Sequence, residues 1–161
     1  KTDIALRPAV EELCKSFTPM ANEHRVMLEM QCETLCVHMS QKHVEQLIGN
    51  LISNAIKYNH EGGTVDVLIR RQENLLVITV EDSGIGISKE DEKHIFERFY
   101  RVDKGRSRKI GGTGLGLSIV KHIARYYHGK IDLFSRENIG TTITITLPDV
   151  IVDESSADQA A

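Results

Sequence analysis

The sequence predicts an α+β fold, a two-layer sandwich in which helices pack on one face of a mixed, mostly antiparallel sheet. Three observations lead to this prediction. Residues 41–59 carry apolar side chains at helical spacing over a long stretch. Several shorter segments alternate apolar and polar residues, as half-buried strands do. Runs of such strands together with three or four helices favour helices packed on one sheet.

Composition limits the class of protein. A chain of 161 residues can form one domain with a real core. Its net charge of −3 gives no reason to expect nucleic acid or an anionic membrane as a partner. Cys14, Cys32 and Cys36 make an odd count without metal-type pairing, so we expect reduced thiols in a cytosolic protein. No apolar run approaches a membrane span and no signal peptide is evident, so we expect no direct membrane contact.

The first half of the chain holds two predicted helices with two short strands between them. A helix is expected from Pro8 to His24, because proline suits a first helical turn, although Pro19 could kink or end it. Residues 26–31 and 35–39 are predicted strands, and Ser40 is a candidate N-cap for the second helix. The core-facing stripe of that helix comprises Val44, Leu47, Ile48, Leu51, Ile52, Ala55 and Ile56.

The second half of the chain holds the remaining strands. Residues 64–71 alternate like a half-buried strand, and residues 75–81 are typical of a more buried one. Residues 130–135 and 141–147 are predicted as the last two strands. Residues 102–111 are basic and lack periodicity, which indicates a mobile loop. We place one domain over residues 1–148 and expect a disordered acidic tail over residues 149–161.

The segment GGTGLGLSIVKHIARYY, residues 111–127, places four glycines directly before a predicted helix. Exposed backbone amides at a helix N-terminus form a site that suits phosphate oxygens. Neither the P-loop pattern nor the dinucleotide-binding fingerprint matches, because no lysine follows Gly116 and no strand precedes the glycines. A flexible hinge or a helix-packing turn explains the glycines equally well.

The segment DSGIG, residues 82–86, follows a buried strand directly. An ionised carboxylate at Asp82 can only accept hydrogen bonds, so it could bind an exocyclic amine such as that of adenine. It would repel the oxygen that guanine has at the same edge, and the glycines would let a planar base lie against backbone. Taken alone, the segment is better explained as a turn after a strand.

One flank of the long helix is polar. Asn50, Asn54, Lys57 and Tyr58 fall within a sector of about 100° beside the apolar stripe. Two carboxamides one turn apart can supply oxygen ligands to Mg²⁺, which also takes waters and phosphates. Lys57 could neutralise phosphate charge, and Tyr58 could pack on a base or ribose. A solvated helix flank is the simpler alternative, but three candidate sites in one short chain make it harder to hold.

Together these segments resemble the catalytic ATP-binding domain of sensor histidine kinases, which belongs to the wider GHKL (Bergerat-fold) ATPase group. NLISNAIKYN (residues 50–59) resembles the N box of that family, DSGIG its first glycine box and IFERFYR (residues 95–101) its F box. GGTGLGLSIVK (residues 111–121) resembles the second glycine box, and GTTITITLP (residues 140–148) the terminal strand. The matches occur in family order and cover roughly residues 3–148.

The resemblance implies a role for each matching residue. Mg²⁺ would be held by Asn50 and Asn54, and catalysis would depend on Asn50, Lys57 and Arg101. Residues 102–111 would be a lid over ATP, and the F box would contact the domain that carries the phosphorylated histidine. The nucleotide-binding residues would be Asn50, Asn54, Lys57, Tyr58, Asp82, Gly84, Gly86, Tyr100, Arg101, Gly112, Thr113, Gly114, Leu115, Gly116, Leu117 and Thr142.

The residue one turn before Asn54 separates two kinds of activity. Gyrase and chaperone-type members of the wider group carry a water-activating glutamate there, whereas this chain has Asn50. The nearest acid, Glu45, points about 140° around the helix from Asn50. We therefore expect transfer of the γ-phosphate to a histidine on a separate domain. A serine/threonine protein kinase of the same fold and a non-catalytic nucleotide-sensing module are the alternatives.

The acceptor histidine is not evident in this sequence. None of the seven histidines has the acidic, proline-followed setting of the family's phosphorylated histidine. The resemblance implies a dimerisation and phosphoacceptor domain in the same parent protein as partner, with a response regulator acting indirectly. We expect this chain to be monomeric, and its parent to be a homodimeric sensor anchored in a membrane, with this domain on the cytoplasmic side.

Overall fold

A five-stranded sheet forms one layer of the molecule. The computed structural model describes residues 1–98, 100 and 116–153. The strands lie in the order β2 (Met27–Cys32), β4 (Thr64–Gln72), β5 (Leu75–Asp82), β7 (Gly140–Pro148) and β6 (Lys130–Arg136). The pair β2–β4 is parallel and the other pairs are antiparallel. This arrangement confirms the predicted mixed, mostly antiparallel sheet.

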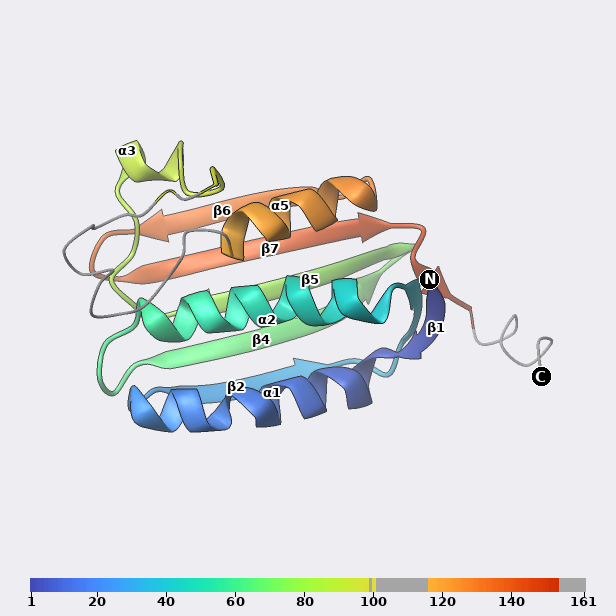
Figure 1. Ribbon diagram of the computed structural model, residues 1–161, viewed down its shortest axis with the longest axis horizontal. Helices are drawn as coiled ribbons and strands as arrows, with labels where there is room; N and C mark the ends of the chain where they lie inside the picture. Colours follow the sequence, from blue (N-terminus) through green and yellow to red (C-terminus); the bar gives the residue numbers. More distant parts are fainter. Residues whose placement is uncertain (99, 101–115, 154–161) are drawn as a thin grey trace.

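Three helices cover one face of this sheet (Figure 1). They are α1 (Leu6–Glu23), α2 (Gln41–Lys57) and α5 (Gly116–Tyr126), while α3 (Lys89–Glu92) is a single short turn. Alternation along the strands explains which face they cover, because Val65, Val67 and Ile69 of β4 are buried while the residues between them are exposed. All seven apolar residues predicted for the stripe of α2 are buried. The predicted two-layer α+β sandwich is confirmed.

The helix ends differ from the sequence-based expectations in detail. Helix α1 begins at Leu6 rather than Pro8, and it continues through Pro19 to Glu23. Ser40 is the N-cap residue of α2, as expected, but its side chain makes no capping hydrogen bond. Instead, the Ser40 backbone N–H donates to the Tyr127 hydroxyl at 2.9 Å, which ties the start of α2 to the end of α5. No helix in the described ranges is both long and apolar enough to cross a membrane.

A second, three-stranded sheet joins the two ends of the described chain. Its order is β1 (Thr2–Ala5), β3 (Cys36–Met39) and β8 (Ile151–Val152), and both pairs are antiparallel. Only β3 was predicted. The other two strands are four and two residues long, and apolar alternation over so few residues gives too little signal.

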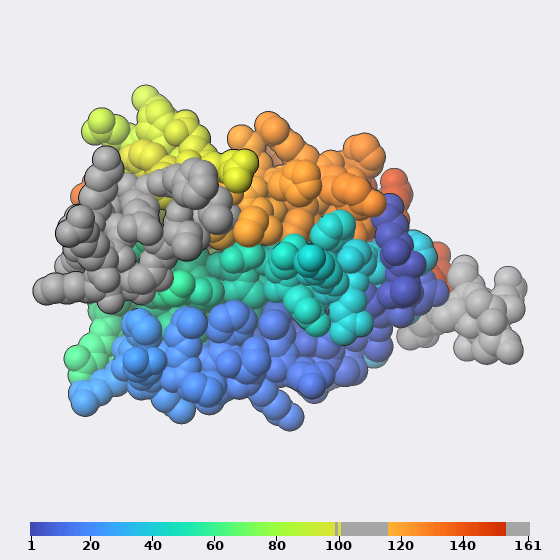
Figure 2. Space-filling model, viewed as in Figure 1, coloured from blue at the N-terminus to red at the C-terminus, as the bar shows by residue number. Residues whose placement is uncertain are grey.

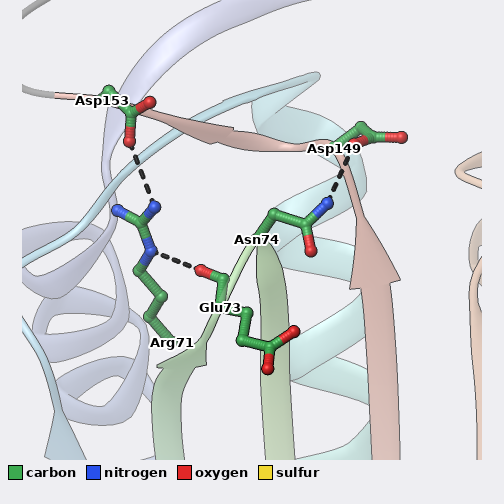
Figure 3. Close-up of polar contacts among 5 residues, drawn as sticks. All are labelled: Arg71, Glu73, Asn74, Asp149 and Asp153. Carbon is green, nitrogen blue, oxygen red and sulfur yellow. Dashed lines mark hydrogen bonds and ion pairs between the residues drawn. The ribbon is translucent and has the colours of Figure 1, made fainter.

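Residues 149–153 belong to the folded domain, although the predicted tail begins at Asp149. Val150 is 4% exposed, and its carbonyl accepts a hydrogen bond from the His38 N–H at 2.7 Å. The end of β4 and the turn that follows it also contact this segment (Figure 3). Arg71 pairs with Asp153 at 3.1 Å, and Asn74 donates to Asp149 at 3.3 Å. The remaining residues of the predicted tail, 154–161, lie outside the described residues.

We predict that the folded domain needs these last residues. A chain ending at Pro148 should have a free energy of unfolding about 2 to 4 kcal/mol lower than one ending at Asp153, since it loses a buried valine and a backbone hydrogen bond. Urea denaturation followed by circular dichroism would measure the difference. Coincident midpoints for the two chains would contradict the assignment of residues 149–153 to the fold.

Candidate functional site

A cavity of about 150 Å³ lies where α2, the loop after β5 and the start of α5 meet. Residues 89–98, which extend beyond α3, stand beside α5 on the same face of the molecule (Figure 2). The cavity therefore draws its walls from segments that are far apart in sequence. Its lining residues are Asn50, Ser53, Asn54, Lys57, Tyr58, Asp82, Ile85, Gly86, Ile87, Ile95, Tyr100, Gly116, Leu117 and Thr141.

The polar flank of α2 forms one wall of the cavity. Asn50, Asn54, Lys57 and Tyr58 all line it, as their spacing on the helix suggested. The carboxamide of Asn50 is oriented by its neighbour, because its Nδ2 donates to the Gln46 carbonyl at 2.6 Å. Its Oδ1 is thereby turned toward the start of α5, where a Cβ atom on Gly116 would lie 3.1 Å from it. A carboxamide held this way uses one of its two N–H groups on the Gln46 carbonyl and turns its oxygen toward the start of α5.

Asp82, the last residue of β5, also lines the cavity. Its Oδ1 accepts hydrogen bonds from two backbone N–H groups, that of Gly84 at 2.9 Å and that of Thr141 at 3.3 Å. No described residue bonds to the other oxygen, Oδ2. Burial raises the pKa of Asp82 from 3.8 to about 6, and the two backbone hydrogen bonds oppose that rise. Asp82 is thus a partly desolvated carboxylate, and its Oδ2 accepts no hydrogen bond from the described part of the chain.

Two glycines let the loop after β5 approach its neighbours closely. A Cβ atom on Gly84 would lie 2.3 Å from the Tyr58 carbonyl oxygen, the same oxygen that accepts the Ile85 N–H at 3.0 Å. Gly86 has a φ of +70°, and a Cβ atom there would lie 2.0 Å from the Arg136 carbonyl oxygen. Gly86 lines the cavity. Gly84 does not line it, but it allows the loop to pack closely against the end of α2.

Tyr100 and Ile95 close the cavity on the side of residues 89–98. The Tyr100 hydroxyl donates to Asp91, and this hydrogen bond raises the pKa of Tyr100 to about 12 and lowers that of Asp91. Asp91 is itself held by Ser88, whose hydroxyl caps α3 by accepting the Asp91 N–H at 3.1 Å. Ile95 is buried and supplies apolar surface to the cavity.

Part of the expected site lies outside the described residues. These positions are Phe99 of the F box, Arg101, the expected lid over residues 102–111, and Gly112, Thr113, Gly114 and Leu115. The last two residues of the glycine-rich segment, Gly116 and Leu117, are described. They begin α5 and line the cavity next to Asn50.

One expected residue is replaced by its neighbour. Thr142 was expected to bind nucleotide, but it is Thr141 that lines the cavity and is 7% exposed. Successive side chains of a strand point to opposite faces of the sheet, so Thr142 faces away from the site. Thr141 lies directly opposite Asp82 in the β5–β7 pairing, and that register cannot be read from the sequence of β7 alone.

Other lining residues were not foreseen. Ser53, Ile85, Ile87 and Ile95 join Thr141 in the cavity wall. Ile85 and Ile87 flank Gly86, so an expected base-binding loop could have directed attention to them. No sequence motif pointed to Ser53, because the binding role on that turn of α2 had been assigned to its neighbour Asn54.

Comparison with known proteins agrees with the geometry. Residues 39–151 match the family of histidine kinase-, DNA gyrase B- and HSP90-like ATPases. The chain is 48% identical to sensor histidine kinase WalK of Bacillus subtilis over 128 residues, which are 78% of this chain and 21% of WalK. It is 48% identical to sensor-like histidine kinase SenX3 of Mycolicibacterium smegmatis over 112 residues, 70% of this chain and 29% of SenX3.

Solved structures show the same fold. The catalytic domain of histidine kinase ThkA, in a nucleotide-free form, superposes with a TM-score of 0.78 at 27% identity, covering 91% of this chain and 94% of that one. The chain thus spans less than a third of WalK and of SenX3, but nearly all of an isolated catalytic domain.

The buried carboxylate has a measurable consequence for stability. Because the pKa of Asp82 is raised to about 6 in the folded state, its protonated form favours folding. That contribution is complete below pH about 4 and is lost as the pH rises through about 6. An Asp82→Asn side chain can still accept the Gly84 and Thr141 N–H groups but carries no charge. We expect the variant to be about 1 to 2 kcal/mol more stable than the original chain at pH 8.

Urea denaturation at pH 8 and pH 4.5 would measure this. The gain should shrink markedly at pH 4.5, where most Asp82 carboxyls in the folded chain are protonated. A variant that is less stable at pH 8 would show that the ionised carboxylate stabilises the fold, contrary to the geometry.

Proposed function

Since the chain belongs to the histidine kinase-, DNA gyrase B- and HSP90-like ATPase family, we propose that it binds Mg-ATP and transfers the γ-phosphate to a histidine on a separate domain. The names of its relatives, sensor histidine kinase WalK and sensor-like histidine kinase SenX3, support this choice within the family. The acceptor would lie in a dimerisation and phosphoacceptor domain of the same parent protein, and a response regulator would receive the phosphate afterwards.

The geometry of Asp82 is the observation that carries the nucleotide assignment. Its Oδ1 is occupied by two backbone N–H groups, so Oδ2 is left as the acceptor on a residue that lines the cavity. The exocyclic amine of adenine is a donor and would satisfy that oxygen, whereas the carbonyl of guanine would meet it as a second acceptor. Ile85, Ile87 and Ile95 supply apolar surface against which a planar base could pack.

The opposite end of the cavity suits the phosphates. Lys57 brings a positive charge, and the N-terminus of α5 lies beside Asn50. The residues present also fit Mg²⁺, because Nδ2 of Asn50 is used by the Gln46 carbonyl and its Oδ1 is left as an oxygen ligand. Asn54, one turn further along α2, would supply the second. Bound Mg²⁺ would neutralise charge on the phosphates.

The lining residues favour transfer to another protein group over hydrolysis. Among the described residues of the cavity wall, Asp82 is the sole carboxylate, and we assign it to the base. Asn50 cannot take a proton from water. Glu45 is exposed, and its Oε1 accepts a hydrogen bond from Gln41 Nε2 at 3.5 Å. The nucleophile would therefore arrive with the acceptor histidine, and this domain would contribute positioning and charge neutralisation.

Transfer is tested by radiolabelling. A version of the chain extended upstream to include the helical domain should gain label from γ-labelled ATP with Mg²⁺, and the label should be acid-labile and base-stable. The chain of residues 1–161 should gain none, and Asp82→Asn in the extended version should abolish labelling, because an amide N–H would face the adenine amine. Acid-stable label would point instead to hydroxyl phosphorylation, and ATP binding without label to a sensing module.

The metal assignment is tested by substitution on α2. Asn54→Ala should reduce the gain in ATP affinity that Mg²⁺ produces by about tenfold or more, since one oxygen ligand is lost. Affinity in the presence of a chelator should change little. Gln41→Ala, an exposed position at the other end of the same helix, is the matched control. Titration calorimetry with and without Mg²⁺ provides the readout, and equal losses in both conditions would remove Asn54 from the metal site.

A further inference from the structure

Ser135 of β6 joins three parts of the site without lining the cavity. It lies opposite Thr141 in the β6–β7 pairing. Its Oγ lies 2.8 Å from Thr141 Oγ1, 3.1 Å from the Gly140 carbonyl oxygen and 2.8 Å from the backbone nitrogen of Ile87. Through these contacts, one half-buried hydroxyl connects the loop after β5 with the first residues of β7. None of the motifs in the sequence includes this serine.

The three contacts can be satisfied together in one way only. A serine hydroxyl has one proton to donate and two lone pairs that accept. The Ile87 N–H can only donate and the Gly140 carbonyl can only accept. The Ser135–Thr141 distance alone fits a donor at either end, but all three contacts are hydrogen bonds only when Ser135 gives its proton to Gly140 and Thr141 donates to Ser135.

This assignment decides the polarity of Thr141. Its hydroxyl proton is directed to Ser135, so Thr141 Oγ1 keeps only lone pairs for a ligand. Thr141 lines the cavity beside Asp82, to which its backbone N–H donates at 3.3 Å. That end of the cavity therefore presents two acceptors, Asp82 Oδ2 and Thr141 Oγ1. No donor from the described side chains of Asp82, Thr141 or Ser135 remains there.

We propose that Ser135 is a positioning residue that sets purine specificity by holding the Thr141 hydroxyl as an acceptor. The inference rests on the proposed function and deepens it. An exocyclic amino group carries two N–H donors and can donate to Asp82 Oδ2 and Thr141 Oγ1 at once. A carbonyl at the same position of the purine has only lone pairs to place against these two acceptors. Ser135 thus acts on the base through Thr141, without touching it.

Inosine triphosphate is the probe, because a carbonyl replaces the exocyclic amine of ATP and N1, a lone-pair acceptor in adenine, carries a hydrogen. We expect Ser135→Ala to reduce the ratio of ATP affinity to inosine triphosphate affinity by about tenfold, because the Thr141 proton is released toward the cavity. Ser135→Thr keeps a hydroxyl and should keep the ratio. Thr142→Val removes a hydroxyl from the adjacent residue on the opposite face of the sheet, and should also keep it.

A double-mutant cycle separates positioning from a general structural role. In a Thr141→Val background, Ser135→Ala should leave the ratio unchanged, because the group through which it acts is gone. If Ser135 had only a structural role, Ser135→Ala would lower the affinities for ATP and for inosine triphosphate by the same factor. That result would overturn the inference without contradicting the proposal that the chain binds ATP. If the unsubstituted chain binds ATP and inosine triphosphate equally well, the inference fails while ATP binding stands, and if it binds neither nucleotide, the proposed function itself fails. Thermal unfolding of each variant identifies loss of fold.

Discussion

The pairing of β5 with β7 is the constraint on which the site depends. This register places Asp82 opposite Thr141, and from there a backbone N–H reaches the carboxylate. A carboxylate at the end of a buried strand is costly unless hydrogen bonds compensate for the lost water. Here two N–H groups compensate one oxygen only, and burial still raises the pKa to about 6. The incomplete compensation leaves the second oxygen to a ligand.

Helix α2 meets two requirements with one pattern. Its apolar stripe is buried against the sheet, and the polar flank beside that stripe lines the cavity. The packing of Leu51, Ile52 and Ala55 therefore also fixes the directions of Asn50 and Asn54. The end of the same helix carries the Tyr58 carbonyl, which accepts the Ile85 N–H and is approached closely by Gly84. Core and site are held by the same contacts.

Sequence reasoning reached the fold and the α2 wall because both depend on local periodicity. The stripe from Val44 to Ile56 specifies a helix and its buried side, and the neighbouring polar flank follows from 3.6 residues per turn. It named Thr142, whereas Thr141 lines the cavity, because which of the two faces the site depends on strand register and so on a long-range contact. Ser135 was missed for the same reason. Its partners Ile87, Gly140 and Thr141 come together only in the folded sheet. Strands β1 and β8 were too short to show a period.

The two ends of the cavity are held by different kinds of structure, and this bears on how the domain could work. Asp82 lies on a strand paired with β7 and accepts backbone N–H groups from Thr141 and from the loop residue Gly84, so the sheet register fixes its position. The other end is formed by side chains of α2 and by the first residues of α5, from separate parts of the chain. Rigid recognition of the base would hold a nucleotide in one register while its phosphates extend toward the start of α5. Under the proposed function, Asp82 is committed to the base and no other carboxylate in the described cavity wall is left to activate water, so the bound nucleotide would persist until an acceptor supplied the nucleophile.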